Sequence, residues 1–170
     1  NYNRFGGKMR EIAALAPNYR MNELTAAVGI AQLDKLPKIC ETRNKYGDRI
    51  TEGIKGIPGI YPHKVLEGGR SSYWFYLFRI DEKVLGTTRS EFVSALLAER
   101  ISCSYGYIPE CVYEYELFKN DKRYYKGLCP VAEKTINDSI KLPVNEFYTD
   151  NDISETISAI NKVADYFLKI

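Results

Sequence analysis

Small and aliphatic residues recur at helical spacing near the beginning of the chain. They mark one face of a segment that Asn22 can cap: Leu24, Ala27, Val28 and Ala31. Proline is not tolerated inside a helix without the loss of a hydrogen bond, but it is tolerated in the first turn. We therefore expect the helix to kink or restart at Pro37 and to continue to about Ile54, where a glycine-rich cluster ends it.

Two later segments carry the capping-box pattern that opens a helix. Thr88-Arg89-Ser90-Glu91 precedes Phe92, Ala95 and Leu96, which lie on one side of a predicted helix. Thr149-Asp150-Asn151-Asp152 precedes a longer amphipathic pattern that runs almost to the end of the chain. Its apolar positions are Ile153, Ile157, Ile160, Ala164 and Phe167.

Three segments between these helices have the composition of strands. Residues 72–80 are rich in aromatic side chains, and residues 101–105 and 139–142 are shorter. With a further short helix before the last strand, this order predicts an α+β fold: about three mainly antiparallel strands covered by helices. Residues 107–125 are rich in loops and aromatic residues. We interpret the aromatic stretches as core, because no basic groove accompanies them as in a nucleic-acid stacking surface.

Composition and charge narrow the class of protein. Of the 170 residues, 45% are hydrophobic and 27% are charged, which is typical of a globular domain. No apolar run approaches the roughly 20 residues of a membrane span, and a formal net charge of +2 gives no case for a nucleic-acid partner. The four cysteines are far apart and only one histidine is present, so we expect no metal site and free thiols in the cytoplasm.

The residues taken alone show no convincing catalytic constellation. His63 lies in a Gly/Pro-rich loop, where a surface position is expected, and no G-x-S-x-G motif is present. Lys8 is an amine nucleophile in principle, but nothing around it would lower its pKa.

The most informative segment is residues 16–33, which read APNYRMNELTAAVGIAQL. It resembles the signature N-Y-R-M-[TN]-E-L-x-A-A-x-G-x-x-Q-L of the DegT/DnrJ/EryC1/StrS family of pyridoxal-phosphate (PLP)-dependent sugar aminotransferases. Further segments resemble landmarks of that family in the same order: 33–46, 72–76, 129–133, 142–144 and 149–157. The resemblance spans essentially the whole chain, but it covers only the C-terminal part of a family member.

That resemblance implies how the chain is divided into domains and where the catalytic lysine lies. Residues 1–21 would be an irregular lead-in, 22–56 interdomain helices, and 57–170 the small C-terminal domain of a fold-type I enzyme. The Schiff-base lysine of the family lies in a preceding large domain, and the residues before Lys8 do not match its motif. We therefore expect no catalytic residue in this chain, and we expect it to be inactive by itself, because the cofactor supplies the electron sink.

Four residues are candidates for binding by the same resemblance. Asn18, with Arg20 as second candidate, matches a segment that reaches the cofactor phosphate of the neighbouring subunit; alternatively, both residues only shape the turn before the helix. Amide and guanidinium donors both suit phosphate oxygens. Tyr107 and Pro109 match the loop at the sugar-nucleotide entrance, although the histidines of many members are missing here.

The implied function is transfer of an amino group from glutamate or glutamine to a nucleotide-linked keto-sugar, by a cytoplasmic homodimer with PLP as cofactor. Two alternatives stay open. Some relatives with histidine in place of the lysine are sugar dehydratases, and the chain could instead be a non-catalytic module for dimerisation or docking.

Overall fold

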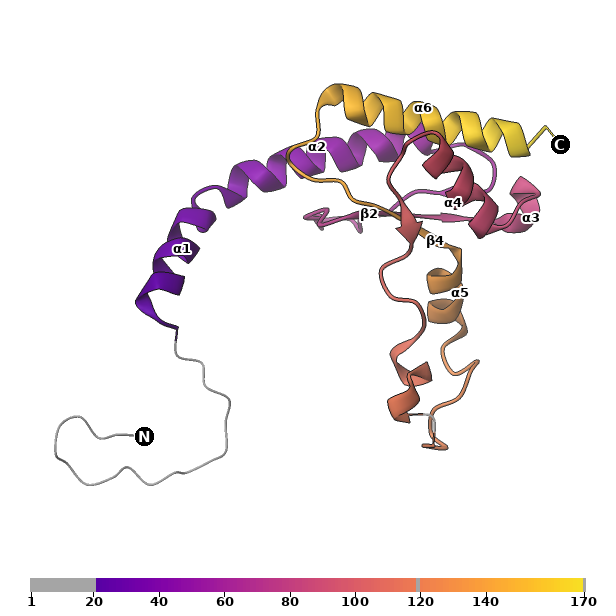
Figure 1. The fold of residues 1–170 in the computed structure, drawn as a ribbon, viewed down its shortest axis with the longest axis horizontal. Coiled ribbons are helices and arrows are strands. Elements are labelled where there is room, and N and C mark those ends of the chain that lie inside the picture. Colours follow the sequence, from indigo (N-terminus) through magenta and orange to yellow (C-terminus); the bar gives the residue numbers. More distant parts are fainter. Residues whose placement is uncertain (1–20, 119, 170) are drawn as a thin grey trace. The chain divides into compact units, whose positions relative to one another are not determined.

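The computed structural model describes residues 21–118 and 120–169, and the chain divides into two compact units, residues 1–36 and 37–170 (Figure 1). In the first unit, helix α1 spans Glu23–Leu33. The Asn22 side chain accepts a hydrogen bond from the backbone N–H of Thr25 at 2.8 Å, which satisfies one of the unpaired donors of the first turn. The expected cap is therefore confirmed. The expected division of the parent protein at residue 57 stays a prediction.

Helix α2 spans Leu36–Ile54 and begins directly after a turn at Asp34 and Lys35. Pro37 is its second residue, where a missing N–H breaks no helical hydrogen bond. The predicted restart at this proline is thus confirmed. Tyr46, Ile50 and Ile54 are buried on one face of α2, and they belong to the core of the second unit.

The second unit contains one antiparallel sheet with the strand order β1-β2-β4-β3. Its strands are β1 (Ile60–Tyr61), β2 (Tyr76–Ile80), β3 (Ser104–Tyr105) and β4 (Ser139–Leu142). The α+β class and the antiparallel pairing agree with the prediction. The number of strands does not: the two-residue β1, which pairs Ile60 with Ile80, is too short to leave a pattern in the sequence.

One face of this sheet is buried by three helices. Tyr76, Phe78 and Ile80 alternate with more exposed residues along β2, so they share the covered face. Helices α2, α4 (Arg89–Ala98) and α6 (Asp150–Phe167) supply the opposing apolar side chains. Figure 1 shows α2 and α6 lying side by side on this face of the sheet. The 4-residue helix α3 (Glu82–Leu85) follows β2 and was not expected.

Both predicted capping boxes are formed. Thr88 accepts a hydrogen bond from the backbone N–H of Glu91, whose carboxylate accepts one from the backbone N–H of Thr88 at 2.9 Å. Thr149 and Asp152 repeat this arrangement at the start of α6, with 2.6 Å between Thr149 N and the Asp152 carboxylate. These bonds from the threonines hold the pKa of both carboxyl groups below the usual range.

The predicted strand at residues 72–80 is shorter than expected because of Tyr73. This residue has a φ of 40°, in the left-handed region that a strand cannot include, and regular pairing begins only at Tyr76. Its side chain is nevertheless buried, with 3% of its surface exposed. The predicted strand at 101–105 likewise shrinks to Ser104–Tyr105.

The ring of Tyr73 occupies space that a side chain at Gly47 of α2 would fill. A Cβ atom at Gly47 would lie 2.5 Å from a carbon of this ring. The Tyr73 hydroxyl also donates a hydrogen bond to Asp48 at 3.0 Å, and its ring stacks on that of Tyr76 at 5.9 Å. These contacts hold the left-handed backbone in place.

A long excursion connects β3 to β4. It contains two short 3-10 helices, η1 (Val112–Glu114) and η2 (Glu116–Phe118), and helix α5 (Pro130–Asp138). In Figure 1 this excursion extends away from the sheet on the side opposite α2 and α6. It corresponds to the loop-rich, aromatic segment that the sequence predicts.

We expect the substitution Gly47→Ala to lower the stability of the chain. The added methyl group would overlap the Tyr73 ring, and overpacking of this kind costs about 1–3 kcal/mol, against at most about 1 kcal/mol gained from helix propensity. The measurement is the urea midpoint by circular dichroism. Gly29→Ala, a helical glycine with nothing within 4 Å, is the matched control and should not lower the midpoint. An unchanged midpoint for Gly47→Ala would contradict the packing described.

Candidate functional site

Tyr107, one of the predicted substrate-binding residues, belongs to a cluster of three aromatic side chains. Its ring stacks on Phe75 with 5.0 Å between centroids and 17° between planes, and it meets Trp74 edge-on at 5.3 Å. Trp74 and Phe75 are themselves 5.4 Å apart. We call Trp74, Phe75 and Tyr107 the aromatic platform. Trp74 is 64% exposed and Tyr107 is 55% exposed, so two of its rings face solvent.

Pro109, the second predicted substrate-binding residue, lies in different surroundings. It lines a cavity of about 210 Å³ beside α5, together with Glu110, Cys111, Glu114, Lys126, Glu133, Ile136 and Asn137. The structure therefore separates the two predicted residues: Tyr107 joins the aromatic platform, and Pro109 joins a polar cavity farther along the excursion.

The shape of this excursion depends on the carboxylate of Glu133 in α5. The Tyr113 hydroxyl donates to Glu133 Oε1 at 2.5 Å, and the backbone N–H of Gly127 donates to the same atom at 2.6 Å. The Tyr113 hydroxyl in turn accepts a hydrogen bond from the backbone N–H of Cys129 at 3.2 Å. The network joins the outgoing and returning parts of the excursion.

The two titratable groups of this network shift in opposite directions. Hydrogen bonds from Tyr113 and from the Gly127 backbone lower the pKa of Glu133. Removal of Tyr113 from water and its bond to Glu133 raise the pKa of the phenol. A charged carboxylate and a neutral phenol are therefore the stable pair at neutral pH, which makes this pair a structural tie rather than an acid and base ready to exchange a proton.

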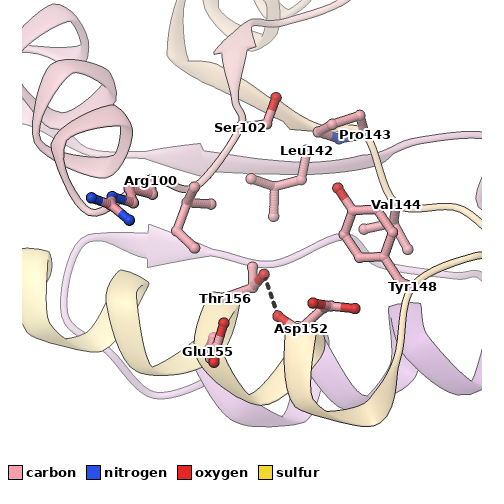
Figure 2. A pocket seen from close by; sticks show the side chains of 10 residues that line it. Arg100, Ser102, Leu142, Pro143, Val144, Tyr148, Asp152, Glu155 and Thr156 are labelled. Carbon is pink, nitrogen blue, oxygen red and sulfur yellow. Dashed lines mark hydrogen bonds between the residues drawn. The ribbon is translucent and has the colours of Figure 1, made fainter.

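A second cavity, of about 270 Å³, lies between α6 and the residues around the end of β4 (Figure 2). Residues from the segment before β3, from β4 and the loop after it, and from α6 line it. Its Asp152 carboxylate is already held by the Thr149 cap, and burial raises the pKa of Tyr148. Figure 2 shows Thr156 bonded to the Asp152 backbone carbonyl across one turn of α6. None of these groups is paired for proton transfer.

Neither cavity fits PLP. The first, beside α5, is lined by Glu110, Glu114 and Glu133 against the single cation Lys126, so it repels a phosphate dianion. The second contains Arg100 but no lysine that could bond the cofactor covalently. The lining of these two cavities is therefore unsuited to the cofactor.

The remaining predicted residues, Asn18 and Arg20, lie outside the described residues. Within residues 21–118 and 120–169, no group of three histidine, cysteine or acidic side chains could hold a metal ion. The same part of the chain contains no helix long and apolar enough to cross a membrane. Cys40, Cys103, Cys111 and Cys129 are free thiols in this structure.

The interpretation of the aromatic stretches as core is wrong for part of them. Tyr73, Tyr76 and Phe78 are buried, whereas Trp74 is among the exposed residues. His63, expected at the surface, is only partly exposed and lies edge-on to the Tyr73 ring at 5.5 Å. Sequence reasoning missed Trp74 and Phe75 as neighbours of Tyr107. A possible signal was the run of four aromatic residues, which exceeds what one face of a strand can bury.

The sequence is similar to one known protein family and to individual known proteins. The model of the DegT/DnrJ/EryC1/StrS aminotransferase family matches residues 2–161. The spore coat polysaccharide biosynthesis protein SpsC of Bacillus subtilis is 30% identical over 151 residues, which are 87% of this chain and 38% of that protein. The GDP-perosamine synthase of Caulobacter vibrioides is 28% identical over 158 residues, covering 86% of this chain and 38% of the synthase.

Solved structures show the same fold. The aminotransferase from Psychrobacter cryohalolentis has a TM-score of 0.82 at 19% identity, over 98% of this chain and 44% of that one. DesV of S. venezuelae, solved in complex with a ketimine intermediate, has a TM-score of 0.79 at 21% identity, over 95% and 42%. This chain thus spans about 40% of the length of the proteins that it resembles.

We expect the Gly127 amide to lose its protection from hydrogen exchange when Glu133 is protonated. Because the folded pKa of Glu133 is lowered, protection should persist as pH falls below 4.5, the ordinary value, and disappear as pH passes through the lowered pKa. Hydrogen-exchange mass spectrometry of the peptide containing Gly127, corrected for intrinsic rates, measures this. Glu133→Leu, which removes the acceptor, should abolish the pH dependence, and Glu110→Gln, in the same cavity lining, should preserve it. Equal protection in wild type and Glu133→Leu at pH 7 would count against the tie.

Proposed function

Because this chain belongs to the DegT/DnrJ/EryC1/StrS aminotransferase family, we propose that it is the C-terminal part of an aminotransferase acting on a nucleotide-linked keto-sugar. Glutamate or glutamine is the proposed amino donor, and PLP is the proposed cofactor of the whole enzyme. The match of the family model over residues 2–161 carries this proposal. The names of relatives such as GDP-perosamine synthase support the substrate class.

In the proposed enzyme the preceding part of the protein holds the cofactor, which supplies an electron sink for the amino transfer. This assignment is supported by the two cavities of the described residues, neither of which suits a phosphate-bearing ring. The chain itself would bind and orient. Asn18 and Arg20 are proposed to donate hydrogen bonds to the cofactor phosphate of a partner subunit, since an amide and a guanidinium both match phosphate oxygens.

Tyr107 and Pro109 are proposed to border the entrance for the sugar nucleotide. The exposure of Tyr107 supports this role, because a residue that contacts substrate must be reachable from solvent. The hydrogen bonds of Glu133 would hold the rest of the excursion in a fixed shape beside that entrance. Fixed groups that orient a bound substrate lower the activation barrier, because the substrate has already lost its freedom of motion before the reaction begins.

We expect the complete enzyme to transfer the amino group and the 170-residue chain to be inactive by itself. Both would be incubated with PLP, glutamate or glutamine, and nucleotide-linked 4-keto-sugars, and the amino sugar would be measured by mass spectrometry. The chain is expected to give no product above the level without enzyme, because the family resemblance assigns the lysine that bonds the cofactor to a preceding domain. Product from the chain alone would contradict this division of roles. A dehydrated sugar without an amine from the complete enzyme would instead favour the dehydratase.

We also propose that the enzyme is a homodimer, and we expect the chain to self-associate through α1. Leu24 and Val28 lie one turn apart on one side of this helix and are both exposed, and exposed apolar surface favours association. Sedimentation velocity at increasing concentration measures the effect. The double variant Leu24→Gln/Val28→Gln should shift the equilibrium towards monomer, and Gln32→Asn on the same helix should leave it unchanged. A wild-type chain that stays monomeric at high concentration would contradict the expectation.

A further inference from the structure

The aromatic platform combines a large apolar surface with exposure to solvent. Trp74 presents its indole at 64% exposure, and Tyr107 presents its phenol at 55%. Phe75 and Tyr107 stack almost in parallel, and Trp74 meets them at 46° and 62°. Three mutually supporting rings restrict each other's motion. The surface is therefore already arranged before anything binds to it, which reduces the entropy that a ligand would lose.

The backbone that presents Trp74 is strained. Tyr73 adopts a φ of 40°, a value that an aromatic residue rarely takes. The strain is held by burial of the Tyr73 ring over Gly47, by its hydrogen bond to Asp48 and by stacking on Tyr76. Burial, and then the bond to Asp48, raise the pKa of Tyr73 to about 12, so the phenol stays neutral and keeps donating.

This strain has a consequence for the next residue. In a regular continuation of β2, Trp74 would lie two residues before Tyr76 and on the same, covered face of the sheet. The left-handed turn at Tyr73 instead ends the ladder at Tyr76 and leaves Trp74 beside Tyr107. Backbone strain that neighbouring contacts hold in place is concentrated at functional sites. The observation therefore points to a function for the residue that the strain exposes.

We propose that Trp74, supported by Phe75 and Tyr107, is the stacking surface for the nucleobase of the nucleotide-linked substrate. This proposal rests on the proposed function, because Tyr107 belongs both to the platform and to the loop proposed to border the substrate entrance. A nucleobase is a planar π system, and the exposed face of an indole is the side chain surface that suits it best. Stacking tolerates any base, so Trp74 contributes affinity rather than selection between nucleotides.

The platform acts on binding and not on the chemical step. It contacts a part of the substrate that does not change during amino transfer, so it stabilises ground state and transition state equally. Loss of such a contact raises KM and leaves kcat unchanged. Trp74 is thus a substrate-binding residue whose kinetic effect differs from that of a group at the reacting carbon.

The test uses the fact that Trp74 is the single tryptophan of the chain. UDP, dTDP and GDP are titrated into the 170-residue chain, and Trp74 fluorescence is followed with correction for absorbance. We expect saturable quenching by all three nucleotides and no quenching by ribose 5-phosphate, which has no base. Phe75→Leu and Tyr107→Leu should weaken nucleotide binding by up to about tenfold, the loss of roughly one stacking contact. Phe147→Leu, an exposed aromatic outside the platform, is the matched control.

In the complete enzyme, Trp74→Leu should raise KM for the nucleotide sugar by a similar factor with kcat preserved. The titration requires no amino transfer, so the two proposals can fail separately. If nucleotides quench Trp74 fluorescence but the complete enzyme transfers no amino group, only the proposed function is contradicted. Three results would overturn the stacking proposal. The first is quenching that rises linearly with nucleotide concentration, as for free indole, and the second is equal quenching by ribose 5-phosphate. The third is a Trp74 in the complete enzyme whose fluorescence acrylamide does not quench.

Discussion

Burial of a single face of the sheet is the constraint on which the rest of the second unit depends. Helices α2, α4 and α6 cover Tyr76, Phe78 and Ile80 on β2 together with the matching side of β4. No helix of this layer reaches the opposite face. The excursion between β3 and β4 is therefore free to leave the sheet on that side.

The elements that were predictable from the sequence are those encoded by neighbouring residues. A capping box needs only the side chains of positions such as Thr149 and Asp152, so both boxes were found correctly. The restart at Pro37 follows from one residue. The end of β2 at Tyr76 could not be found in this way, because it depends on Gly47, which is distant in the sequence and leaves room for the Tyr73 ring. Strand β1, at two residues, exists only through its pairing with β2.

The same distinction holds for the candidate site. Tyr107 and Pro109 were identified by resemblance to a family. Such a resemblance indicates which positions matter but not which residues surround them. The resemblance could not indicate that Tyr107 stacks on Phe75 while Pro109 lines a cavity bounded by glutamates. The aromatic stretch that contains Trp74 is interpreted as core from the sequence because no basic groove accompanies it. The exposure of Trp74 results from the backbone at Tyr73, which no local pattern reveals.

Two parts of the excursion, around Pro109 and around Tyr107, differ in charge and therefore in the part of a nucleotide that each can bind. Around Pro109, three glutamates and one lysine leave an excess of negative charge, which disfavours the phosphates of a nucleotide. The platform at Tyr107 has no charged member, and its apolar rings suit a neutral base. A nucleotide that stacked on Trp74 would therefore have to direct its phosphates away from the cavity beside α5.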